Sequence, residues 1–275
     1  MRIASVGHAV FAATFIVLGI QGLLPGHFAQ LVGQLPKDTA GRELLVALIY
    51  LRPFAYLACG LGLFWQRSSG AAARVLFAYL LLWMLAFKIP FILRSPTVEV
   101  YYQNWGETAV LAAGAWVLYA WLAPAWDRQR LGFATGARGV SDARILYALA
   151  LIAFGLSHFA YLGNTAPLVP AWLPWHVFWA YFTGSTYLLA AAGILIGVCA
   201  RLAAALSALQ MGLFTLLVWT PLMVAGTITA GQRGEFIVSW MLTAAAWVVT
   251  DSYRRVPWLA ARSHASAGVA AERAL

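Results

Sequence analysis

The chain has 275 residues, of which 63% are hydrophobic and only 10% are charged. A soluble domain needs about 25% charged residues to cover its surface, so this composition excludes an ordinary soluble protein. The net charge of +9 could suggest nucleic-acid binding, but the basic residues are scattered between apolar runs and form no basic patch. We therefore expect the lipid bilayer to be the main partner, and we expect no nucleic acid.

Eight apolar stretches are long enough to cross a bilayer, which takes about 20 helical residues. In chain order they cover residues 3–24, 43–65, 72–93, 106–123, 144–162, 176–198, 201–224 and 235–252. The sequence therefore predicts an all-α transmembrane fold with eight helices in one bundle. The first stretch resembles a signal peptide, but it has a counterpart in the middle of the chain, where no signal peptide could stand.

The second half of the chain repeats the first, with one short match in each helix. The matches are Gly19 with Gly155, then Tyr50, Tyr56 and Gly62 with Tyr181, Tyr187 and Gly193, then Lys88 and Pro90 with Trp219 and Pro221, and finally Gly106 and Glu107 with Gly234 and Glu235. We predict a first four-helix repeat over residues 1–123, a polar cytoplasmic linker over 124–143, a second repeat over 144–253 and a cytoplasmic tail over 254–275.

Lys and Arg are divided unevenly between the two sides of the predicted bundle. With eight crossings, the side that holds both termini carries twelve of them and the other side carries four. Positive charge in short loops marks the cytoplasmic side, so we predict a multi-pass inner-membrane (plasma-membrane) protein with both termini in the cytoplasm. Because each repeat has an even number of helices, the two repeats are parallel and related by an axis along the membrane normal.

Two cations fall inside the predicted helices. A charge in the bilayer costs at least about 2.5–3.5 kcal/mol on insertion scales, so each is a candidate for function. Arg52 lies nine residues into the second helix, beside Pro53, which should free a backbone carbonyl. A structural ion pair or carbonyl clamp is the alternative for Arg52. Lys88 lies near the outer end of the third helix, where its side chain could reach the interface by snorkelling.

Glu107 and Glu235 are predicted to open the last helix of each repeat, where the helix dipole favours a carboxylate. N-terminal capping is therefore the alternative to a functional role. Since Glu107 begins on the same outer side as Lys88, we predict that Arg52, Lys88 and Glu107 form a cluster facing the bundle interior. The second half lacks these cations.

His158, in the fifth helix, is a lone histidine among apolar residues. It is either a hydrogen-bonded structural residue or a ligand, and no histidine spacing in the chain is that of a metal or haem site. Cys59 and Cys199 stand apart and are interpreted as packing residues. The sequence indicates no cofactor, although a quinone is compatible with it.

A patterned segment begins around His158. A Gly-x-x-His-Phe motif is followed by Val-Pro-x-Trp-Leu-Pro, Thr-Gly and a basic residue, here Gly155, His158 and Phe159; Val169, Pro170, Trp172, Leu173 and Pro174; Thr183 and Gly184; and Arg201. The segment resembles the DoxX family of small four-helix bacterial membrane proteins. The resemblance is clearest over 155–204, extends loosely over 144–252 and implies a doubled member. The family often carries an acidic residue after Thr-Gly, and Ser185 to Tyr187 contain none.

Three functions are compatible with these features. The family resemblance and the lack of catalytic motifs favour a non-catalytic accessory or scaffold component of a redox or envelope system, with a second membrane or periplasmic subunit as partner. A quinone-linked oxidoreductase subunit would use Arg52, Glu107 and His158 at the head group. A small-molecule transporter would use the same polar residues as an outward-opening pocket. The fold of a family alone does not decide among them.

Overall fold

The computed structural model describes residues 4–24 and 41–261, and every regular element within these ranges is helical. Five helices are long and apolar enough to cross a membrane, namely Arg42–Phe64, Ser69–Arg94, Gly136–Ala160, His176–Ile196 and Ala200–Val224. These helices confirm the all-α, membrane-type fold expected from the composition.

The first half of the chain contains α1 (Val6–Gly22), α3 (Arg42–Phe64), α4 (Ser69–Trp83), the π-helix η1 (Met84–Lys88), α5 (Ile89–Arg94) and α6 (Glu99–Leu122). The second half contains α7 (Ala125–Arg130), α8 (Gly136–Ala160), α9 (Leu162–Thr165), the 3-10 helix η2 (Ala166–Leu168), α10 (His176–Ile196), α11 (Ala200–Phe214), the π-helix η3 (Thr215–Trp219), α12 (Thr220–Val224) and α13 (Ala230–Asp251).

Each half has a long helix interrupted by a π-turn just before a proline. Pro90 follows η1, and Pro221 follows η3. A proline has no N–H and its ring collides with the carbonyl four residues earlier, and the wider π-turn relieves both problems. The starts of four elements in the first half recur in the second half at one constant sequence interval: Ser69 and Ala200, Met84 and Thr215, Ile89 and Thr220, and Glu99 and Ala230.

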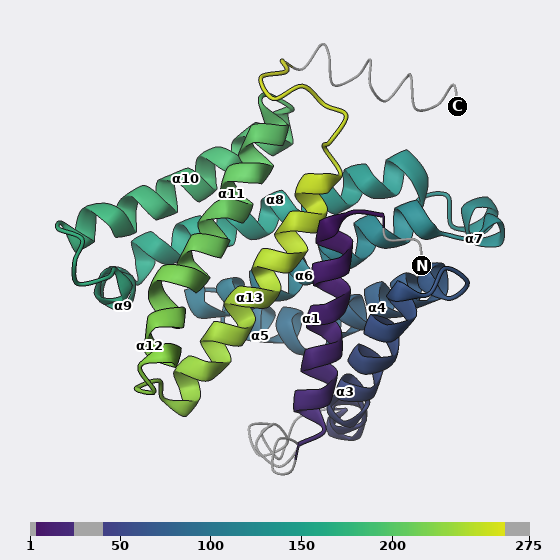
Figure 1. Cartoon of the computed structure of the whole chain (residues 1–275), viewed down its shortest axis with the longest axis horizontal. Helices are drawn as coiled ribbons and strands as arrows, with labels where there is room; N and C mark the ends of the chain where they lie inside the picture. The colour runs from purple at the N-terminus through teal and green to yellow at the C-terminus, as the bar shows by residue number, and fades with distance from the viewer. Residues whose placement is uncertain (1–3, 25–40, 262–275) are drawn as a thin grey trace.

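The long helices of the described ranges form a closed ring. Each packs against the next one along the chain, and α13, the last, packs against α1, the first (Figure 1). The ring is also bridged across its middle, because α6 packs against α13. At that crossing a Cβ on Gly114 would lie 3.1 Å from the Cα of Ala245, and these two residues are separated by the same interval as the paired element starts.

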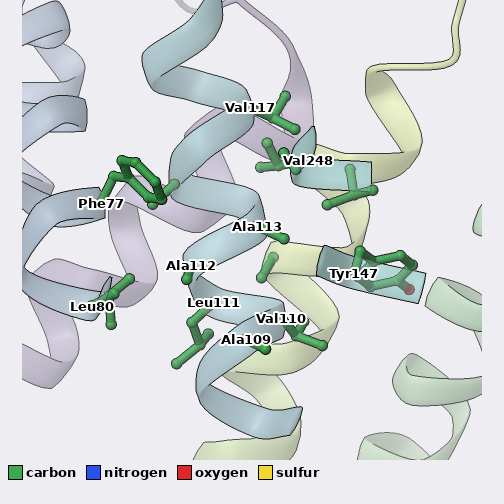
Figure 2. Packing of buried hydrophobic residues seen from close by; sticks show 14 of the residues in the cluster. Phe77, Leu80, Ala109, Val110, Leu111, Ala112, Ala113, Val117, Tyr147 and Val248 are labelled. Atoms are coloured by element: carbon green, nitrogen blue, oxygen red, sulfur yellow. The ribbon is translucent and has the colours of Figure 1, made fainter. Parts of the chain in front are cut away.

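Helix α6 lies in the centre of the packing (Figure 2), with Phe77 and Leu80 on one side and Tyr147 and Val248 on the other. Its run from Ala109 to Ala120 is buried except for Trp116, which is half-buried. Small residues let helix backbones approach closely, which is how helices associate when lipid removes the hydrophobic driving force. The alanine-rich middle of α6 therefore brings the two halves together.

A glycine also lies where the first two helices of each half cross. A Cβ on Gly19 of α1 would lie 2.5 Å from the backbone nitrogen of Leu57 in α3. In the second half, a Cβ on Gly155 of α8 would lie 2.6 Å from Leu188 of α10. The backbone contact makes glycine necessary at the first crossing, and the partner leucines keep the same sequence interval as the element starts.

One end of the molecule gathers most of the arginines. The Arg254 guanidinium donates to the carbonyl of Ala4 (3.2 Å), and Arg144 Nε donates to Ser252 Oγ (2.9 Å). The start of α1, the start of α8 and the end of α13 therefore lie together. We call this the arginine-rich end; it carries Arg67, Arg74, Arg128, Arg130, Arg138, Arg144, Arg201, Arg254 and Arg255.

Three helices begin earlier than the sequence predicts. α6 begins at Glu99 and not at 106, α8 at Gly136 and not at 144, and α13 at Ala230 and not at 235. The predicted polar linker 124–143 is therefore largely helical, because it holds α7 and the first turns of α8. Hydropathy marks only the hydrocarbon-crossing part of a helix, whereas the helix itself runs on to its cap, such as the Thr229–Gln232 capping box of α13.

Candidate functional site

The five residues singled out in the sequence lie on five different helical segments. Arg52 is in the middle of α3, Lys88 is the last residue of η1, and Glu107 is the ninth residue of α6. Glu235 is the sixth residue of α13, and His158 lies near the end of α8. Neither glutamate opens its helix, so the interpretation of both as N-terminal caps at equivalent positions is wrong.

Lys88 and Glu107 form the centre of the charged group. Their charges interact with each other, and Lys88 also experiences the charge of Arg52. Gln103, one turn earlier on α6, lies beside the Glu107 carboxyl. All four side chains are partly buried. We refer to Arg52, Lys88 and Glu107 as the charged cluster; it joins α3, η1 and α6 inside the first half of the ring.

The π-turn of η1 determines where the Lys88 side chain lies. A π-turn adds one residue to a helical turn, which rotates the residues after it relative to those before it. Lys88 ends this turn, and the proline at position 90 gives the turn its physical cause. π-turns are frequent at functional sites, and this one ends at a cation whose charge influences that of Glu107 in α6.

An aromatic wall adjoins the charged cluster. The Arg52 guanidinium lies 5.6 Å from the centre of the Trp83 ring, and the Trp83 and Phe87 rings stack with centroids 4.1 Å apart. Behind them, the Tyr79 hydroxyl donates to the carbonyl of Leu48 at 2.8 Å and so links α4 to α3. A cation over an aromatic face is stabilised by the ring's negative face, so this wall holds Arg52 inside the helix ring.

Glu235 lies at the edge of this group. It is exposed, and its charge is close enough to affect Glu107. The corresponding region of the second half is neutral. There the Thr215 hydroxyl is 2.7 Å from Ser239 Oγ, and Gln210 is hydrogen-bonded to Thr186 Oγ1 (2.5 Å). The interior of the second half therefore holds hydroxyl and amide groups at this place, where that of the first half holds charged side chains.

His158 does not join the charged cluster. Its Nδ1 donates to the carbonyl of Phe154 at 2.8 Å, and its ring centre is 5.8 Å from that of Tyr187. A Cβ on Gly184 would lie 2.8 Å from the Cβ of His158, so the histidine packs where α8 crosses α10. The contacts of His158 are therefore with Phe154, Tyr187 and Gly184, on α8 and α10.

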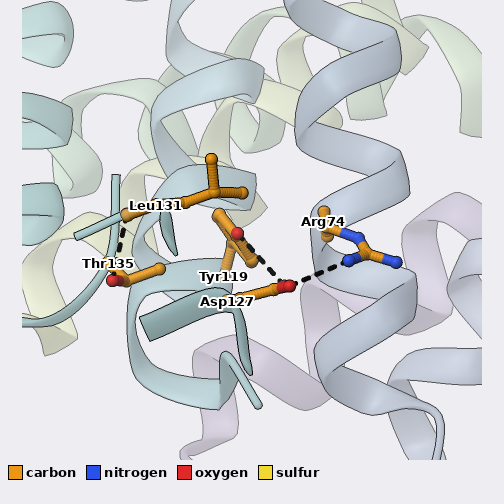
Figure 3. A network of polar contacts seen from close by, with 5 residues as sticks. All are labelled: Arg74, Tyr119, Asp127, Leu131 and Thr135. Atoms are coloured by element: carbon orange, nitrogen blue, oxygen red, sulfur yellow. Dashed lines mark hydrogen bonds and ion pairs between the residues drawn. The ribbon is translucent and has the colours of Figure 1, made fainter. Parts of the chain in front are cut away.

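An ion pair with a buried carboxylate lies at the arginine-rich end, and no sequence pattern indicates it. Asp127, in α7, has a fully buried side chain; its Oδ1 accepts from Arg74 at 2.9 Å, and its Oδ2 accepts from the Tyr119 hydroxyl at 3.1 Å (Figure 3). The interpretation of 124–143 as a polar linker places Asp127 among residues expected to be exposed. The pair instead fastens α7 to α4 and α6.

Within the described residues, no group of three or more His, Cys, Asp and Glu side chains could hold a metal ion. Cys59 and Cys199 are both free thiols. The charged cluster is therefore the strongest candidate site in this part of the chain. Comparison with protein-family models, with curated proteins and with solved structures finds no match in any of the three.

Proposed function

We propose that α1, α6 and α13 cross the membrane together with the five helices named above, which gives eight crossings with both termini in the cytoplasm. These helices all belong to one ring, so neighbours packed along their lengths span the same layer. α6 and α13 bridge the ring, and the polar residues of their first turns need not face lipid. The gathering of arginines at the end shared by α1 and α13 supports cytoplasmic termini.

We also infer that the chain is a doubled four-helix unit. Four element starts recur at one constant interval, and the leucines at the two glycine crossings keep that interval. Gly114 and Ala245, at the same interval, touch each other. A residue that contacts its own counterpart lies next to a two-fold axis, so the contact supports an axis between α6 and α13, along the membrane normal.

The function that we propose is that of a DoxX-like, non-catalytic accessory or scaffold component of a redox or envelope system in the bacterial inner membrane. The observation that carries it is that Lys88 and Glu107, partly buried in the first half of the ring, lie near enough for their opposite charges to influence each other. A charge inside a helix ring is costly unless an opposite charge lies near it, so each of these residues helps the ring to accommodate the other. The resemblance of residues 155–204 to the DoxX family supports the same role.

A partner subunit would meet the protein at its exposed aromatic residues. Trp172 and Trp175, in the segment between η2 and α10, are 69% and 77% exposed. Large exposed apolar side chains that cluster mark interaction sites. Trp126, at the arginine-rich end, is also exposed, at 54%, and provides a matched control.

The test is purification from native membranes in mild detergent at native expression, followed by mass spectrometry of the associated proteins. We expect one subunit in a fixed ratio to the chain. Trp172→Ala with Trp175→Ala should release it, and Trp126→Ala should not. A monodisperse protein with no associated subunit would contradict the proposal, as would equal loss in the control.

A quinone-linked subunit is the second candidate. It is favoured by the position of Arg52 and Lys88 beside the stacked rings of Trp83 and Phe87, since a quinone head group offers carbonyl acceptors and a flat ring. We expect Arg52→Ala to abolish binding of a short-chain quinone, measured by fluorescence quenching of tryptophan. Unchanged binding in that variant would remove the reason for this candidate.

A further inference from the structure

A crevice at the arginine-rich end lies apart from the charged cluster. It has a volume of about 620 Å³ and is lined by residues of several segments, among them Ala4, Gln66, Ser69, Trp121, Arg128 and Arg254. Binding cavities for small molecules fall in the range of about 300–1,000 Å³. The crevice is large enough for a phosphate-bearing head group.

The charge of the crevice is positive. Arg128 and Arg254 line it, and none of its described lining residues is acidic. The acid next to Arg128, Asp127, does not line the crevice and is neutralised by Arg74. The start of α4 and the end of α6 both reach the crevice, at Ser69 and Leu122, and their opposite helix-dipole charges offset each other. The two guanidinium groups therefore set the sign of the local field.

Arg254 is held in place by two contacts and keeps donors that a ligand can use. Its Nη1 donates to the carbonyl of Ala4, and its guanidinium lies 5.4 Å from the centre of the Trp121 ring. An arginine has five N–H donors in a rigid fork, and the Ala4 contact uses one. Paired donors of this kind match two oxygens of a phosphate. Arg128, which also lines the crevice, forms no ion pair with any described residue.

We propose that this crevice binds the phosphate of an anionic phospholipid. The inference rests on the proposal that the ring of helices crosses the membrane. It does not depend on the proposed accessory or scaffold function. The crevice lies at the ends of α4 and α6, where head groups meet the helices, and the indole of Trp121 is a side chain typical of that level. Basic pockets between helices on the cytoplasmic side are suited to anionic head groups.

The experiment is native mass spectrometry of the full chain, stripped of lipid in mild detergent and then given equal amounts of phosphatidylglycerol and phosphatidylcholine. We expect one phosphatidylglycerol bound in preference. Each arginine near a lipid phosphate contributes about a five-fold change in binding, the effect of one basic residue at an anionic surface. Arg128→Gln should therefore lower the bound fraction by about that factor, and Arg128→Lys should keep most of it.

Arg130→Gln is the matched control, because it removes the same charge from the same short helix. Arg130 stacks over Trp126, at 4.8 Å, and does not line the crevice. Equal loss in Arg130→Gln and Arg128→Gln would overturn the proposal, and so would equal binding of the two lipids. Arg254→Gln also removes a contact to Ala4. If Arg254→Gln unfolds for that reason, the test rests on Arg128→Gln.

A second arm separates the lipid from a soluble phosphate. Glycerol phosphate is added at millimolar concentration before the lipid. Retention of phosphatidylglycerol supports the head group as ligand. Displacement of the lipid together with a phosphate-dependent rise in Tm, absent in Arg128→Gln, would assign the crevice to a free phosphate compound and overturn the phospholipid.

Discussion

At the scale of single side chains, the Arg74–Asp127 ion pair and the charged cluster differ in how far water reaches them. The Arg74 side chain is 43% exposed while its partner Asp127 is fully buried. Lys88 and Glu107 are both partly buried, in η1 and α6 of the helix ring. Removing one partner leaves the other charge without compensation, which costs more than the pair contributes.

Glu107→Gln tests the charged cluster. We expect it to lower the free energy of unfolding by roughly 1–3 kcal/mol, the cost of leaving a partly buried polar group unpaired, as measured by thermal unfolding in detergent. Adding Lys88→Met should restore stability, because that cation then no longer needs compensation. Glu235→Gln, at an exposed position, is the control, and an equal effect there would contradict the assignment.

Asp127→Asn tests the pair at the arginine-rich end. The substitution takes the counter-charge from Arg74 and one acceptor from the Tyr119 hydroxyl. We expect a destabilisation of about 1–3 kcal/mol, moderated by the exposure of Arg74, in the same thermal assay. Asp142→Asn, at a half-buried position that forms no ion pair with a described residue, should change stability by less than half as much. The reverse order would disprove the role of Asp127.

At the scale of helices, close approach depends on glycine at the crossing of the first two helices of each half. Gly19→Ala places a methyl group 2.5 Å from the Leu57 backbone, which neither backbone can relieve without separating α1 from α3. We expect a loss of about 1–3 kcal/mol from overpacking, measured by denaturation in mixed micelles. Gly163 has open space around it, so Gly163→Ala should leave the stability unchanged. If Gly19→Ala were as stable as Gly163→Ala, the close approach of α1 and α3 at Gly19 would be disproved.

The helices also show what can be predicted from a sequence. The apolar spans predicted at 43–65, 176–198 and 201–224 agree closely with α3, α10 and α11–α12, because length and hydropathy decide them. The starts of α6, α8 and α13 are not predicted, since they depend on capping and on polar turns. Lys88 is recognisable as a costly charge, but the burial of Asp127 arises from the packing of α7, which no local pattern indicates.

At the scale of the whole molecule, the arrangement of charges predicts the orientation in the membrane. We expect a cysteine placed at Arg138 to react with a membrane-impermeant thiol reagent only after cells are permeabilised, and one placed at Pro96 to react in intact cells. The native Cys59 and Cys199 are replaced by alanine for this assay. Labelling in the reverse order would show that the termini lie outside the cell.

The contact between the first helix and the last has a consequence for how the chain could be reconnected. α1 packs on α13, and Arg254 bonds to Ala4. The packing of the ring therefore does not depend on which helix comes first in the chain. A circularly permuted gene, joined by a flexible linker across the old termini and opened between Gly132 and Phe133, should yield a protein that unfolds as cooperatively as the parent. Failure of the permutant to fold would mean that synthesis order, rather than contact, closes the ring.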